Sequence, residues 1–299
     1  MTENYANARF YRYKYMGVYN ISFRSMGDLY LFLKCEPAVN KDVFYHLSSI
    51  EGSADFAGEP YEKAVRYCID GYDGDYKTVM KMKKELEKYI PIQSAIRHRE
   101  NSFAGSHPNV PAFIAGSPKA MYRLERSKEK KFCTVWFNLA YPSSTTKNAV
   151  INRGAVTLSL IDLLESRGFI VNFKVFMSVY CRDEIFLFEI VLKNPQERLS
   201  IKKCCYPICA REFTRRIIMR IMESVPFRSG EWYPNYGLPL SDEQSRALFG
   251  LESDDMLISS PYEMGISGDD IISDGKNMLK KLGIDRNIFL PEQKYGERL

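Results

Sequence analysis

The chain has 299 residues, of which 45% are hydrophobic and 26% are charged, and its mean hydropathy is −0.30. These values are ordinary for a folded globular protein and exclude the disordered, collagen-like and disulfide-scaffold classes. No window approaches the roughly 18 apolar residues of a membrane-spanning helix, and the N-terminus lacks the apolar run of a signal peptide. Seven cysteines without framework spacing predict reduced thiols and a cytoplasmic location.

The formal net charge of +5 is unevenly distributed along the chain. Residues 1–131 carry +5 and residues 132–228 carry +6, whereas residues 229–299 carry −6. Two interpretations stay open: the acidic part docks on the basic body and neutralises it, or each patch faces an external partner.

The N-terminal residues alternate aromatic and basic side chains, which is typical of a strand because side chains two residues apart share a face. Aromatic and cationic side chains are common anchors in protein interfaces. They also stack on bases and neutralise phosphates in nucleic-acid complexes. The candidate partner-binding residues on this strand are Arg9, Tyr11, Tyr13 and Tyr15.

Residues 28–34 predict a short helix capped by Ser25 or Asp28, and residues 60–90 predict two helices that are separated by glycines. Residues 91–118 are rich in proline and glycine and predict a boundary that leads into a short helix over 119–126.

From residue 131 onward strands alternate with helices, which predicts an α/β fold with a mostly parallel sheet flanked by helices. A short link between the second and third strands permits a hairpin. The predicted strands span 132–140, 169–177, 184–192 and 256–261, and the predicted helices span 149–168, which Gly168 ends, 207–224 and 269–283. The predicted division of the chain is an α+β module over 1–110, a linker with a short helix over 111–130, and the α/β domain over 131–299.

The predicted helix over 207–224, opened by Pro207, has apolar residues on one side and arginines on the other. The arginine side is a second candidate surface for a partner, whether a protein or the backbone of a nucleic-acid duplex. Its residues are Arg211, Arg215, Arg216 and Arg220.

The order strand, helix, strand, antiparallel strand, helix, strand, helix over 131–283 resembles a von Willebrand factor A-type domain. That family carries an Asp-x-Ser-x-Ser metal motif directly after the first strand. Here Asn138 stands in place of the carboxylate, and Ser143 and Ser144 fall out of register. The resemblance therefore implies the fold without the metal site, because a hard cation requires more oxygen ligands than this loop offers.

Three further segments resemble an uncharacterised family of phage and mobile-element proteins. They are FAGEPYEKAVRYCIDGYDGD, HPNVPAFIAGSPKAMYRLER and NRGAVTLSLIDLLESRGFIVNF, in that order. This resemblance spans roughly residues 50–175 and implies a viral or mobile-element setting, in the host cytoplasm or associated with a virion. No activity comes with it.

The cysteines, acidic residues and histidines of the chain fit structural roles better than catalytic or metal-binding ones. Among Cys204, Cys205 and Cys209, the last two form one C-x₃-C pair. A zinc site usually has a second such pair, so the cluster is a weak candidate for a zinc site. The acidic residues 254–274 match helix caps better than a two-metal nuclease site. His98 lies between two arginines, and nucleotide-binding and nucleophile-elbow motifs are absent from the sequence.

These observations predict a protein without catalytic, cofactor-binding or metal-binding residues that acts by binding another protein of the host or the phage. Inhibition of host defence, virion assembly and an adaptor role all fit, and self-association stays open. The alternatives are a nucleic-acid-binding protein of phage or plasmid replication and a metal-dependent nuclease.

Overall fold

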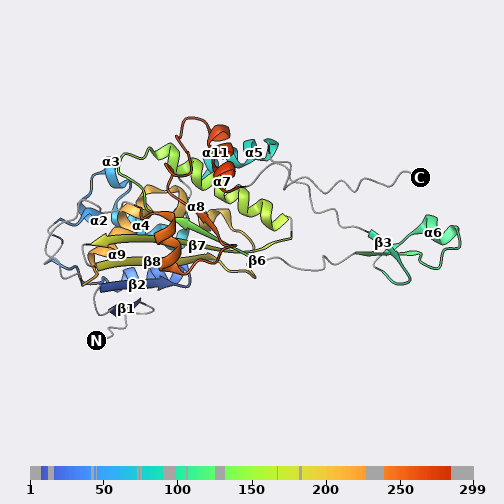
Figure 1. Ribbon diagram of the computed structural model, residues 1–299, viewed down its shortest axis with the longest axis horizontal. Coiled ribbons are helices and arrows are strands. Elements are labelled where there is room, and N and C mark those ends of the chain that lie inside the picture. The colour runs from blue at the N-terminus through green and yellow to red at the C-terminus, as the bar shows by residue number, and fades with distance from the viewer. Residues whose placement is uncertain are drawn as a thin grey trace.

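A six-stranded sheet forms the centre of the molecule (Figure 1). The computed structural model describes residues 8–12, 17–41, 44, 46–72, 74, 76–89, 99–105, 107–124, 132–166, 168–181, 184–226 and 239–283. The strand order is β1-β2-β8-β7-β6-β9. These strands are β1 (Ala8–Arg12), β2 (Gly17–Phe23), β6 (Phe132–Asn138), β7 (Ile170–Cys181), β8 (Glu184–Lys193) and β9 (Met256–Ile258).

The sheet is mostly parallel, as the alternation of strands and helices predicts. β2 pairs in parallel with β8, and β6 pairs in parallel with both β7 and β9. The antiparallel pairings are β1 with β2 and β7 with β8. The β7–β8 pairing confirms the hairpin that the short link between these strands allows. An α/β fold with helices flanking a mostly parallel sheet is therefore confirmed.

The two N-terminal strands belong to this same sheet. β2 runs beside β8 from Gly17 opposite Glu184 to Phe23 opposite Ile190, and β1 forms the edge beyond it. The sheet thus joins segments that the sequence-based division places in different parts of the chain. The division at residues 110 and 131 itself stays a prediction.

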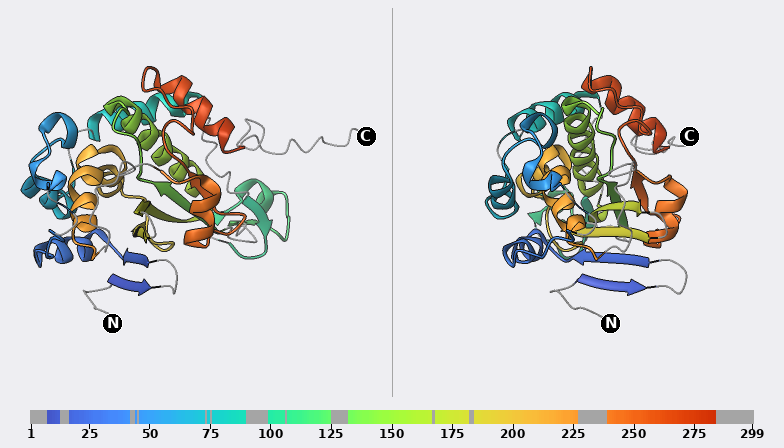
Figure 2. Two further views of the ribbon diagram at one scale, coloured as in Figure 1. Left: turned by 60° about the vertical axis from the view of Figure 1, so that its left-hand side comes forward. Right: turned by 90° about the vertical axis from the view of Figure 1, so that its left-hand side faces the viewer.

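Helices cover the sheet, and most pack on one face (Figure 2). Ser25 caps the first helix by accepting a hydrogen bond from the Asp28 amide, and Gly168 follows the long helix α7 with a positive φ of 87°, as expected. The helices of the main body are α1 (Met26–Lys34), α2 (Ser48–Glu51), α3 (Ala54–Ala57), α4 (Tyr61–Asp70), α5 (Tyr76–Tyr89), α7 (Lys147–Ser166), α8 (Ile201–Cys209), η1 (Phe213–Ile218), α9 (Met219–Glu223), α10 (Asp242–Phe249) and α11 (Ile271–Lys281).

The opposite face of the sheet carries a second, smaller apolar cluster. Trp136 alternates with the core residues Val135 and Phe137, so its side chain points to the other face. There it packs with Phe176, and Phe249 of α10 lies 6.0 Å from the Trp136 ring and 4.8 Å from the Phe176 ring. The sheet is consequently flanked by helices on both faces.

The helix predicted over 207–224 was wrong at its start. α8 begins at Ile201 and contains Pro207. The helix ends at Ala210, which has an extended backbone conformation, and a second helical stretch that includes the π-helical turn η1 follows. Proline is favoured in the first helical turn. Here burial of Cys204, Cys205 and Ile208 at helical spacing outweighs that preference, because these side chains pack in the core.

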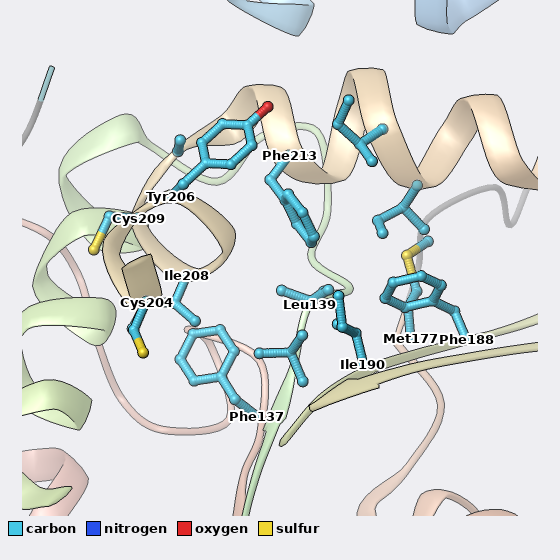
Figure 3. Close-up of a cluster of buried hydrophobic side chains, with 14 of the residues drawn as sticks. Phe137, Leu139, Met177, Phe188, Ile190, Cys204, Tyr206, Ile208, Cys209 and Phe213 are labelled. Carbon is cyan, nitrogen blue, oxygen red and sulfur yellow. The ribbon is translucent and has the colours of Figure 1, made fainter. Parts of the chain in front are cut away.

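Aromatic residues link the second helical stretch to the sheet (Figure 3). Phe213 points from η1 toward Leu139, above the core side chains Met177 and Phe188 of the strands. The Phe213 ring packs edge-on against Tyr206, with 5.3 Å between centroids. These rings are fully buried, so they contribute much of the apolar burial that stabilises the domain.

A second, three-stranded sheet stands apart in the sequence between α5 and β6. Its order is β3-β5-β4, and Figure 1 shows it with α6 at one end of the molecule. The helix predicted over 119–126 is wrong, because residues 121–124 pair antiparallel with β3 as a strand. The elements of this module, which we call the 99–124 module, are β3 (Arg99–Ser102), β4 (His107–Pro108), α6 (Val110–Ile114) and β5 (Met121–Leu124).

The close approach of α7 to α8 predicts that Gly154→Ala destabilises the protein. A Cβ at residue 154 would lie 2.4 Å from the Cys209 sulfur and 2.9 Å from the Ile208 carbonyl oxygen. We expect a loss of about 1–3 kcal/mol in the free energy of unfolding, measured by denaturant titration. Gly27→Ala in α1 is the control, since its Cβ would meet only Ser25 at 3.5 Å. Equal stability of the two variants would contradict this packing.

Candidate protein-binding surface

The arginines of the second helical stretch are inside the protein. Arg215 and Arg216 are each 4% exposed and Arg220 is 8% exposed, while Arg211 is half-buried. The exposed arginine face that the amphipathic pattern predicts is therefore not present at these three residues.

Arg216 makes the largest number of these buried contacts. Its guanidinium donates hydrogen bonds to backbone carbonyls between Ser49 and Glu59. Burial lowers the pKa of Arg216, and its guanidinium donates to five carbonyl oxygens. These belong to Ser49 at 3.0 Å, Ile50 at 3.1 Å, Gly52 at 2.9 Å, Gly58 at 3.4 Å and Glu59 at 2.8 Å.

The neighbouring arginines extend the same pattern of side chain to backbone contacts. Arg215 donates to the Phe56 carbonyl at 2.6 Å and stacks on the Phe56 ring at 4.5 Å. Arg220 donates to the Pro37 carbonyl at 2.7 Å, and Arg211 donates to the Asp55 carbonyl at 2.8 Å. Together the four arginines hold the segment 37–59 against the helix, so their role here is structural.

The N-terminal candidates lie at the edge of the central sheet or beyond the described residues. Arg9 and Tyr11 belong to β1, where their backbones pair with Asn20 and Val18 of β2. Tyr13 and Tyr15 lie outside the described residues. Of this set, the described backbone of Arg9 and Tyr11 lies in the central sheet, whereas the arginines of the other set lie on the helical stretch after Ala210.

The acidic residues of the C-terminal part have structural partners. Asp274 is 1% exposed and accepts hydrogen bonds from the Ser267 amide, the Gly268 amide and the Asn152 amide group at 2.7–3.0 Å. Asp270 caps α11. In the part of the chain that the structure describes, His, Cys, Asp and Glu residues form no group of three or more with metal-binding geometry.

The carboxyl edge of β6 and β9 holds a buried cation, which is the most unusual charged group in the core. Arg153 is fully buried, stacks 4.2 Å from the Phe137 ring centroid and donates to the Ser259 carbonyl at 2.8 Å. Its Nε has no hydrogen-bond partner among the described residues, and burial lowers the Arg153 pKa to about 9. Where the resembled family has its metal motif, Asn138 is buried and accepts from the Ala140 amide.

An exposed apolar surface lies on the 99–124 module. Phe103 is 71% exposed, Val110 55%, Phe113 73% and Ile114 79%. Scattered exposed apolar residues are normal, whereas several large ones in one small module mark an interaction site. Among residues of this module whose burial the structure describes, Asn109 alone is buried. Apart from the residues whose burial is not described, the module has no apolar core of its own.

Polar contacts hold the module together instead. Asn109 caps α6 by accepting from the Ala112 amide at 3.3 Å, and its side-chain amide donates to Asn101 at 2.8 Å. Its backbone amide donates to the Ala120 carbonyl at 2.8 Å. Because these bonds order the module without burying its apolar residues, the apolar side chains stay available for a partner.

The sequence pattern does not predict that these residues form a surface. Prolines and glycines are frequent in the segment and periodic apolar residues are few, which is typical of a linker. The available signal was the i, i+3, i+4 spacing of Val110, Phe113 and Ile114, one turn long and placed between turn residues.

One family model matches residues 5–286, that of a domain of unknown function, DUF7192. The chain belongs to this family. No curated protein and no solved structure matches it. Within the described residues, helices of the length and apolarity needed to cross a bilayer do not occur.

The contacts of Arg216 predict a large loss of stability for Arg216→Met. Five carbonyl oxygens, that of the buried Ser49 among them, would lose this donor, and we expect the free energy of unfolding to fall by about 3 kcal/mol or more. Arg211→Met, which removes one bond from a half-buried side chain, should cost less than about 1 kcal/mol. Denaturant titration measures both, and similar losses would contradict the role of Arg216.

Burial of the thiols predicts their reactivity. Burial raises the pKa of Cys68 and of Cys204 to about 12, so at mildly alkaline pH few of these groups are thiolates, whereas Cys35 is exposed. Titration of the native protein with a chromogenic disulfide should show a fast phase that Cys35→Ser reduces. Cys204→Ser should leave that phase unchanged, and loss of fast reaction in this variant would refute the prediction.

Proposed function

We propose that this protein acts by binding another protein and carries out no chemistry of its own. The observation that carries the proposal is the apolar surface of the 99–124 module, with Phe103, Phe113 and Ile114 each more than two-thirds exposed. Apolar surface of this kind drives protein association when a partner removes it from water. Asp270 and Asp274 accept hydrogen bonds from neighbouring groups, and Cys68, Cys204, Cys205 and Cys209 are buried.

We further propose that the α/β part is a von Willebrand factor A-like domain that has lost its metal site. Two observations support this proposal. Strands and helices follow one another along the chain in the order on which the resemblance rests, and β8 is antiparallel to β7 within the sheet order β8-β7-β6-β9. Asn138 bonded to the Ala140 amide supports the loss of the metal site. The phage or mobile-element setting rests on the three sequence segments named above.

Nucleic-acid binding is the less favoured function. Phosphate binding requires cations that reach the surface, and Arg215, Arg216 and Arg220 donate to carbonyl groups inside the protein. A protein of this kind would show affinity that falls steeply with salt concentration.

Affinity capture with the full-length protein from its native host tests the proposed function. We expect one protein to be captured in stoichiometric amount, and raising the salt concentration should weaken that capture much less steeply than salt weakens DNA binding. A gel-shift series with duplex and single-stranded DNA over the same salt range is the comparison. DNA binding that weakens steeply with salt, without stoichiometric capture of a protein, would overturn the proposal.

A further inference from the structure

We infer that the occupant of the 99–124 module is an acidic amphipathic helix of the partner protein, and this inference rests on the proposed function. Its apolar side would pack on the face of α6, and its carboxylates would pair with the basic residues of the module. The inference depends on three properties of the module: the composition of the face, its rigidity and its charge.

The face of α6 is apolar and uncovered. Val110, Phe113 and Ile114 stand at i, i+3 and i+4, so their side chains lie on one side of the helix. None of the five residues of α6 is buried. An amphipathic helix presents apolar side chains at the same spacing, which makes it the simplest secondary structure that covers such a face.

The face is held rigid at both ends of α6. Asn109 caps its N-terminus. At its C-terminus the Gly116 amide donates to the Phe113 carbonyl at 3.0 Å and the Ser117 amide donates to the Ala112 carbonyl at 2.9 Å, which is a Schellman motif. Gly116 has a φ of +69°, a conformation that glycine adopts without strain. A surface ordered before binding loses less conformational entropy when its partner binds.

The charge of the module favours a partner with carboxylates. Residues 99–124 contain Arg99, Lys119 and Arg123 against one carboxylate, Glu100, which gives a net charge of +2. Lys119 and Arg123 are exposed, and the Lys119 ammonium lies 5.8 Å from the Phe103 ring centroid. Carboxylates of an acidic helix could therefore meet these cations while its apolar side covers the rings.

Two other occupants fit these observations less well. A second copy of the chain, related by a two-fold axis, would bring the same net +2 charge against itself. An anionic membrane presents no row of apolar side chains at the helical spacing that matches Val110, Phe113 and Ile114. The observations therefore favour a helix of another protein.

The test uses the full-length protein and a matched pair of synthetic amphipathic helices with identical apolar positions. One peptide carries Glu and the other Lys at the flanking positions. We expect the Glu peptide to bind about tenfold or more tightly than the Lys peptide in fluorescence anisotropy at moderate salt. We expect the double variant Phe113→Ala/Ile114→Ala to weaken this binding by about tenfold or more. Equal affinity for the two peptides, or binding of neither, would overturn the inference.

Four further variants complete the test. Tyr262→Ala removes an equally exposed ring outside the module, and we expect it to leave peptide affinity unchanged. Lys119→Glu/Arg123→Glu should reverse the preference between the two peptides. Gly116→Ala should weaken binding because alanine is strained at that φ, whereas Gly250→Ala, with a φ of +62° outside the module, should not. An unreversed preference, or loss of binding in either matched control, would count against α6 as the site.

The other occupants are detected directly. Sedimentation equilibrium that shows a dimer lost in Phe113→Ala/Ile114→Ala would assign the face to a second copy. Flotation with phosphatidylserine vesicles that is lost in the same variant would assign it to a membrane. If the native partner is captured equally by this variant, the proposed function stands and the present inference is wrong. Absence of any captured protein contradicts the proposed function itself.

Discussion

The insertion of the Arg216 guanidinium into a ring of five backbone carbonyl groups is the interaction on which the arrangement of the body depends. These hydrogen bonds orient α2, α3 and the loop before α4, which follow α1 in the sequence. A buried guanidinium is costly unless its donors are satisfied. Five carbonyl groups satisfy them here, so the conformation of the loop depends on the helix that carries Arg216.

The sequence predicts the order of strands and helices in the α/β part, because apolar periodicity and glycine positions report local structure directly. It does not predict the environment of Arg215, Arg216 and Arg220. A polar side of a helix is equally compatible with water and with carbonyl groups of a distant loop, and only tertiary structure distinguishes them. The same limit applies to β2, whose pairing with β8 bridges more than 160 residues.

The apolar surface shows the opposite limit. Phe103 and Phe113 lie in a segment whose prolines and glycines are typical of a linker, yet hydrogen bonds of Asn109 and the ends of α6 order it. Such bonds depend on single side chains rather than on a repeating pattern, and a search for periodicity does not find them. Arg215, Arg216 and Arg220 of the body are buried, whereas Phe103 and Phe113 of the module are exposed.

The pairing of β2 with β8 also bears on how the molecule is made. On the ribosome, residues 17–23 emerge long before residues 184–190, and until then the inner edge of β2 has no strand to pair with. Native contacts so distant in sequence slow folding, since a long loop must close before they form. In a nascent chain of this protein the β8-facing edge of β2 thus stays without its native partner through most of synthesis. During that time a chaperone or another strand can bind that edge.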